Sequence, residues 1–245
     1  MRHSARRGVT LIEVVVAVTL LSLLSLGILY AMRVGLSAFS KTDARLMDDR
    51  RVAGAQTILL EELEGMMPVV TPCGAGESAG PRVAFFDAQP QSMRLVSTFS
   101  LQEGWRGQPQ ILEFMVIPGQ ENRGVRLVVN ETPYGGIPSV APLCTGLAPD
   151  PVSGLAIPSF APASPGPKSF VLADKLAYCR FSYLVTANEP DERMPLWNSS
   201  ATRMGWPFAI RVEMRPLEPD PSRLQPITVT APIHLYRSPG IPYVD

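Results

Sequence analysis

The chain has 245 residues, of which 46% are hydrophobic and 18% are charged, and its formal net charge is zero. This balance excludes the basic field of a typical nucleic-acid-binding protein, and the length suits one soluble domain plus a helix. Only two histidines occur and no cluster has metal-ligand spacing, so we predict a protein that is not an enzyme and has no cofactor or metal.

Residues 1–8 form a short basic leader that contains Arg2, Arg6 and Arg7 and ends at Gly8. An apolar segment follows over 9–32 and holds one acid, Glu13. About 20 helical residues cross a hydrocarbon core of about 30 Å, so this segment predicts a transmembrane helix. A carboxylate is costly at such a depth, which marks Glu13 as a functional candidate.

A secretory signal peptide is the common alternative for a basic leader before an apolar run. The run is longer than the usual ~7–15 residues of such signals, and no small-residue cleavage site follows Met32. We therefore prefer a retained anchor. The leader arginines place the N-terminus in the cytoplasm and everything after about Arg33 across the membrane.

The sequence Gly8-Val9-Thr10-Leu11-Ile12-Glu13, preceded by Arg6 and Arg7, resembles the processing site of type IV pilins and of the pseudopilins of type II secretion. The resemblance implies that a prepilin peptidase cuts between Gly8 and Val9 and methylates the new terminus. Glu13 would then be the fifth residue of the mature chain. Val9 departs from the phenylalanine or methionine that is usual at this position.

Two roles are open for Glu13. Thr10 and Glu13 have the spacing of a capping box, in which the carboxylate accepts the Thr10 amide. Burial in an assembly would instead demand a paired charge, which the amine of a neighbouring subunit's Val9 can supply. We favour this salt bridge between subunits.

Helical periodicity continues over 33–67, with apolar residues on one face. The charged residues, including Glu61, Glu62 and Glu64, are assigned to the polar face. No proline occurs between Val9 and Pro68, so we expect one unkinked helical spine, with a membrane half and an amphipathic half, that ends near Gly65.

Residues 68–245 predict a β-rich domain. Residues 208–215 alternate strictly between apolar and polar, as in an antiparallel strand with one wet face. The amphipathic helix is expected to cover the apolar face, which gives an α+β, pilin-like fold. We expect loops over 133–167, 188–207 and 216–226, and strands over 82–86, 93–101, 111–117, 125–130, 169–172, 177–185, 208–215 and 227–235.

Three cysteines lie beyond the anchor, where a periplasm would permit disulfides. Cys73 and Cys144 lie among prolines and glycines, whereas Cys179 lies on a strand pattern with Phe181 and Tyr183. Three pairings are possible. We prefer a bridge between Cys73 and Cys144, with Cys179 buried.

The order of the later segments resembles the J-type minor pseudopilins of type II secretion. The segments concerned are 83–86, 93–97, 170–172, 181–184, 196–197 and 206–212. The resemblance implies a subunit of the pseudopilus tip, anchored in the bacterial inner membrane with a periplasmic domain. Its partners would be the other minor pseudopilins, the major pseudopilin and the inner-membrane assembly platform. The alternative is a minor pilin of a type IV pilus, acting in adhesion, motility or DNA uptake.

Overall fold

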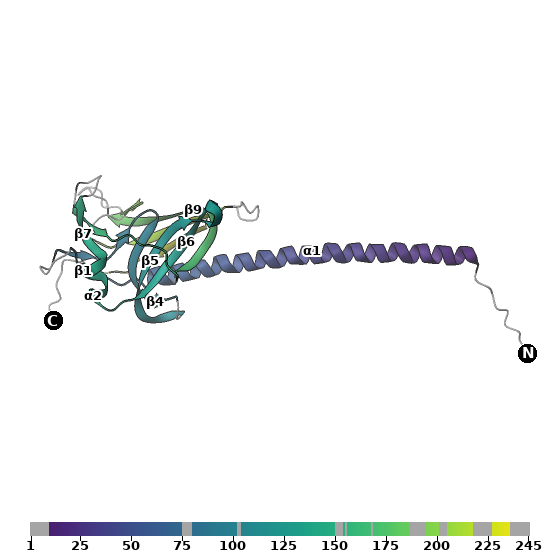
Figure 1. Cartoon of the computed structure of the whole chain (residues 1–245), viewed down its shortest axis with the longest axis horizontal. Helices are drawn as coiled ribbons and strands as arrows, with labels where there is room; N and C mark the ends of the chain where they lie inside the picture. The colour runs from purple at the N-terminus through teal and green to yellow at the C-terminus, as the bar shows by residue number, and fades with distance from the viewer. Residues whose placement is uncertain are drawn as a thin grey trace, which may run out of the picture. The chain divides into compact units, whose positions relative to one another are not determined.

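A computed structural model describes residues 10–74, 80–101, 104–149, 154, 156–167, 169–186, 195–200, 205–217 and 227–235 (Figure 1). The side chains of 40–52, 105 and 106 lie outside this description. The chain divides into two compact units, Met1–Ala53 and Gly54–Asp245.

Helix α1 runs over Leu11–Glu64 as one α-helix of 54 residues. It ends because Gly65 meets strand β4 (Ser92–Ser100) at close range. The Thr98 amide donates to the Gly65 carbonyl at 2.8 Å, and a Cβ on Gly65 would collide with the Ser97 hydroxyl. The Met67 amide then donates to the Val96 carbonyl at 2.7 Å, so the chain leaves the helix along the edge of β4.

An antiparallel sheet of eight strands dominates the second unit, in the order β12-β11-β9-β6-β5-β4-β3 with β10 also paired to β9. Its longest members are β5 (Trp105–Pro118) and β9 (Phe170–Thr186). The others are β3 (Asp87–Ala88), β4, β6 (Val125–Pro133), β10 (Pro195–Asn198), β11 (Ala209–Pro216) and β12 (Ile227–Pro232). The predicted α+β class, a long apolar helix followed by an antiparallel sheet domain, is confirmed.

One face of the sheet, here the inner face, is apolar and is covered by the last turns of α1. Leu59 and Leu63 are fully buried there and belong to the same cluster as Phe114, Phe181 and Ile210. The expected cover by the amphipathic helix is therefore confirmed for the turns that lie in the second unit. Cys179 is buried in this cluster, as expected from its alternation with Phe181.

The opposite, outer face is covered over β4, β5 and β6 by residues 133–167, here called the proline-rich segment. We expected only a loop over 133–167, and this is wrong, because β7 (Cys144–Pro149) pairs with β8 (Ala156–Phe160). Two short helices precede them, α2 (Ile137–Val140) and η2 (Ala141–Leu143). Val140 and Phe160 pack here on Val96 and Ile111 of the sheet, which gives the segment a second small core.

Two further expectations about strands are corrected. The predicted strands over 169–172 and 177–185 are one strand, β9, which passes from β6 to β11 through irregular pairing near Lys175 (φ 53°). Strand β10 lies inside the expected loop over 188–207 and pairs with the end of β9. A separate hairpin, β1 (Val70–Pro72) with β2 (Arg82–Ala84), and a 3-10 turn, η1 (Gln120–Asn122), complete the described elements.

Candidate functional site: the N-terminal helix and the β domain

The predicted processing site lies at the extreme N-terminus. Arg6, Arg7, Gly8 and Val9 fall outside the described residues, which begin at Thr10. The roles assigned to these four residues therefore stay predictions.

Glu13 lies in the first turn of α1 and is exposed. Its amide donates to the Thr10 carbonyl at 3.1 Å, and the Val14 amide donates to the same oxygen at 3.3 Å. Among the described residues, no hydrogen bond joins the Glu13 carboxylate to Thr10. The carboxylate is thus presented on the helix surface, where the positive end of the helix dipole favours an acid.

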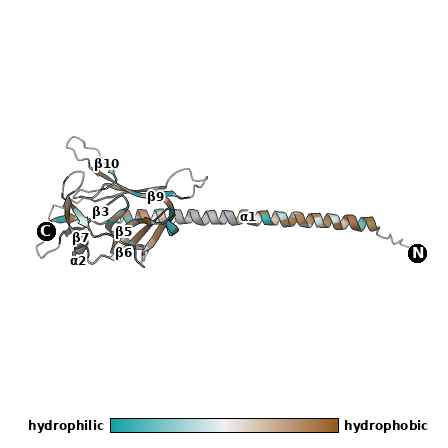
Figure 2. Ribbon diagram, turned by 45° about the horizontal axis from the view of Figure 1, so that its top comes forward, coloured by the Kyte–Doolittle hydropathy of each residue, from teal (hydrophilic) through white to brown (hydrophobic). Residues whose placement is uncertain are grey.

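The end of α1 nearer the N-terminus is coloured mostly as hydrophobic in Figure 2. From Leu11 to Phe39 the large apolar side chains are 49–85% exposed. This stretch of 29 residues contains an 18-residue window with a mean hydropathy of 2.5, and it is long and apolar enough to cross a membrane. The hydroxyls of Thr19, Ser22, Ser25 and Ser37 donate to carbonyls three or four residues earlier, so each donor is satisfied within the helix.

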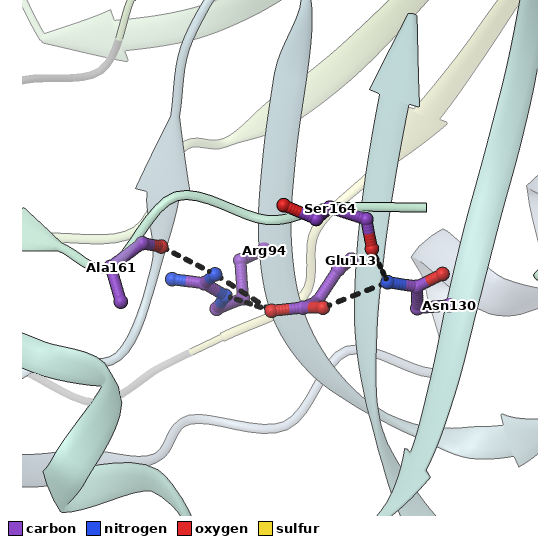
Figure 3. A network of polar contacts seen from close by, with 5 residues as sticks. All are labelled: Arg94, Glu113, Asn130, Ala161 and Ser164. Carbon is purple, nitrogen blue, oxygen red and sulfur yellow. Dashed lines mark hydrogen bonds and ion pairs between the residues drawn. The ribbon is translucent and has the colours of Figure 1, made fainter. Parts of the chain in front are cut away.

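In the β domain, a polar network fastens the proline-rich segment to the outer face (Figure 3). Arg94, Glu113 and Asn130 lie opposite one another on β4, β5 and β6. The Arg94 Nε donates to Glu113 at 2.8 Å and its Nη2 donates to the Ala161 carbonyl at 2.8 Å. The Asn130 amide donates to Glu113 at 3.1 Å and to the Ser164 carbonyl at 2.9 Å.

A disulfide links the start of β7, within the same segment, to the residue that follows β1. It joins Cys73, which follows β1, to Cys144, the first residue of β7, with their Cα atoms 5.1 Å apart. Both cysteines are buried together with Val83. Cys179 is free, and burial raises the pKa of its thiol to about 12.

Glu62 is the feature that sequence reasoning missed. We assigned it to the polar face of the helix, but it is fully buried on the face that Leu59 and Leu63 share. Neither carboxylate oxygen has a hydrogen-bond partner among the residues that the structure describes. Burial, and secondarily the charge of Glu131 on β6, raise its pKa from 4.5 to about 8. Its spacing, three residues after Leu59, is the signal that would have placed it inside.

Residues 76–80 read Gly-Glu-Ser-Ala-Gly and match the Gly-x-Ser-x-Gly pattern of serine hydrolases. That pattern needs a strand-to-helix turn. The described elements on either side, β1 and β2, instead pair with each other as a hairpin. Ser78 itself lies outside the described residues, and the context does not support a nucleophile.

A comparison with protein families matches residues 3–29 to the prokaryotic N-terminal methylation motif. A search of curated proteins found no match. The family match supports a type IV pilin-like or pseudopilin protein, a class that is processed by a prepilin peptidase and assembles with other pilins. It suggests a structural protein, and the apolar helix indicates a membrane anchor.

Proposed function

We propose that the chain is a minor pseudopilin of the type II secretion system. It would join the tip complex that primes the pseudopilus for export of proteins across the outer membrane. The observation that carries the assembly role is Glu13, an exposed acid in the first turn of α1 that is followed by the uncharged residues 14–32 and lies within the methylation motif. The choice of type II secretion rests on the resemblance of the later segments to the J-type minor pseudopilins.

In this proposal residues 1–8 are cytoplasmic and are removed, and residues 9–32 cross the inner membrane. Residues 33–64 continue the helix, and the chain after Glu64, which meets strand β4 at once, belongs to the periplasmic domain. Subunits waiting in the membrane keep Glu13 near the interfacial region. When subunits leave the membrane they stack into a helical filament. Such a filament requires head-to-tail contacts between subunits that do not close into a ring.

In this proposal the pairing of Glu13 decides whether a subunit enters the stack. Once the helices are packed together, its carboxylate lies in a medium of low dielectric and needs a cation. Cleavage after Gly8 creates one, the amine of Val9. That amine does not readily fold back along its own helix to Glu13, whereas the terminus of a neighbouring subunit reaches it. Loss of one partner of such a buried pair costs roughly 3–5 kcal/mol, which is enough to exclude a subunit from the stack.

The test uses a strain that lacks the gene and is complemented with the wild type, Glu13→Ala or Glu13→Gln. Both variants should insert in the membrane, because removal of a charge favours insertion. Both should fail to crosslink to the other minor subunits and should leave cargo in the periplasm. Glu121→Gln, at an exposed position of the β domain, is the matched control and should behave as the wild type.

Three outcomes count against parts of the proposal. Normal crosslinking and secretion by both variants would show that Glu13 does not drive assembly. Rescue by Glu13→Gln alone would reduce its role to a capping hydrogen bond. Intact secretion with lost surface pili or twitching in the deletion strain would favour a minor pilin of a type IV pilus, which has the same N-terminal features.

A further inference from the structure

The outer face of the sheet is only half covered. The proline-rich segment lies over β4, β5 and β6, through the contacts of Arg94 and Asn130. Strands β9, β11 and β12 carry exposed or half-buried side chains on the same face. These are Tyr178, Arg180, Ser182 and Leu184 of β9, Arg211, Glu213 and Arg215 of β11, and Thr228 and Thr230 of β12, with Trp197 of β10 at the end.

Three of these side chains, Arg180, Arg211 and Arg215, together with the rings of Tyr178 and Trp197, form what we call the basic face. Arg180 lies opposite Glu213, and Arg215 lies opposite Tyr178, so the arginines occupy neighbouring rungs of two paired strands. Glu213 is the one acid among these described side chains and offsets only one of the three arginine charges. The face therefore stays net positive and favours the binding of an anion.

The described residues offer little internal neutralisation. The Arg211 Nη1 atom is 3.9 Å from Glu213, at the limit of an ion pair. Among the described ion pairs, none involves Arg180 or Arg215. The Nε of Arg211 is buried and has no hydrogen-bond partner within the described ranges. The exposed guanidinium groups of Arg180 and Arg215 therefore have N–H donors available for a ligand.

Aromatic rings hold the guanidinium groups of Arg180 and Arg211 in place. The Cζ of Arg180 lies 5.4 Å from the ring centroid of Tyr178, and the Cζ of Arg211 lies 3.8 Å from that of Trp197. Such contacts hold the flat group against the ring and leave its N–H edge for a carboxylate. Less side-chain entropy is then lost when a carboxylate binds.

A concave pocket borders the basic face at Arg180. Its volume is about 430 Å³, within the range of pockets that hold side chains or small ligands. The apolar part of the lining comes from six residues, namely Pro90, Met115, Val116, Ile117, Ala163 and Pro165. The pocket therefore offers a place for an apolar group directly beside a cation.

We propose that the basic face docks an acidic segment of a partner protein, with carboxylates on Arg180 and Arg215 and a neighbouring apolar side chain in the pocket. Charge complementarity selects this occupant. A nucleic acid fits less well, because a guanidinium already occupies one face of each ring that a base would stack on. The inference goes beyond the proposed function and stands without it.

The test measures fluorescence anisotropy of a labelled peptide that alternates Glu and Asp with Leu, titrated with the full processed chain in detergent micelles. Arg180→Glu and Arg215→Glu should each weaken binding about tenfold or more, because charge reversal turns attraction into repulsion. Arg123→Glu is the matched control, since Arg123 is an exposed arginine outside the basic face and pairs with Glu121, and should leave binding unchanged. Unaltered thermal unfolding of each variant shows that the fold is retained.

Two further probes define the ligand. A peptide with Gln and Asn in place of the acids should not bind, and replacement of Leu by Ala should weaken binding to the wild type but not to Ile117→Ser. A single-stranded oligothymidine of similar charge that binds more tightly, and depends on the same arginines, would replace the proposal with nucleic-acid binding. Peptide binding that is absent, or equal in all arginine variants, would overturn it.

Discussion

Glu62 should make the β domain less stable as the pH rises from about 4.5 to about 8. Its pKa is about 8 in the folded protein and 4.5 in the unfolded chain. In that window the folded state holds a proton that the unfolded state has released, so the free energy of unfolding falls as pH increases. At 1.36 kcal/mol for each pH unit, the total loss is about 3–5 kcal/mol. Below pH 4.5 and above pH 8 this group adds no further slope.

The magnitude follows from the position of Glu62 on α1. Both carboxylate oxygens are buried without a hydrogen-bond partner in the described part of the chain, and the nearby Glu131 already accepts the Leu101 amide at 2.9 Å. The ionised form therefore finds neither water nor a cation. Glu62→Gln should remove the slope, and Glu62→Met should raise the free energy of unfolding at pH 8 by a similar amount, because it also removes a buried polar group.

The assay is urea unfolding followed by tryptophan fluorescence at several pH values. Trp105, Trp197 and Trp206 all lie in the unit Gly54–Asp245, so the signal reports that unit. Glu61→Gln is the control, because Glu61 is the exposed neighbour of Glu62 on the same helix, and it should keep the wild-type slope. If Glu62→Gln retains the full wild-type slope between pH 5 and pH 8, the assignment of a neutral buried carboxyl is wrong.

Three further outcomes are expected. Cys144→Ser should lower the free energy of unfolding by about 2–4 kcal/mol and leave Cys73 as a free thiol. An unchanged free energy of unfolding in non-reducing urea titrations would mean that no bridge forms. Arg94→Met should lower the free energy of unfolding by about 1–3 kcal/mol, since the partly buried Glu113 carboxylate loses its cation and keeps only the hydrogen bond from Asn130 among the described residues, and the added change Glu113→Gln should recover much of that loss in the same titration. Cys179, whose thiol pKa is raised to about 12 by burial, should react with iodoacetamide only after unfolding, so rapid labelling of the folded protein would contradict its placement.

The helix and the main strands could be predicted because their patterns are local. Strand β11 alternates over 209–216, and α1 has no proline to interrupt it. The split of β9 into two predicted strands has a local cause as well. The polar residues Asp174 and Lys175 look like a turn, and the continuity across them comes from pairing with β6 and β11, which a single sequence does not reveal.

The proline-rich segment and Glu62 depend on distant contacts. Prolines and glycines in 133–167 predict a loop, whereas the strands β7 and β8 form there, with the start of β7 held by the disulfide and the residue after β8 held by Arg94. Glu62 has the charge of a surface residue, and the end of α1 at Gly65 fixes which face of the helix meets the sheet. The position of Glu62 on the same helix face as Leu59 and Leu63, rather than its charge, determines that it is buried.

The most direct measurement is the mass of the N-terminal peptide of the chain extracted from membranes of its host. Cleavage between Gly8 and Val9, followed by methylation, should give a peptide that begins with N-methylated Val9 and lacks the first eight residues. This result would show that the mature chain carries the Val9 amine that the proposal pairs with Glu13 of a neighbouring subunit. A mature terminus beyond Met32, or an uncleaved leader, would contradict a pilin-like subunit.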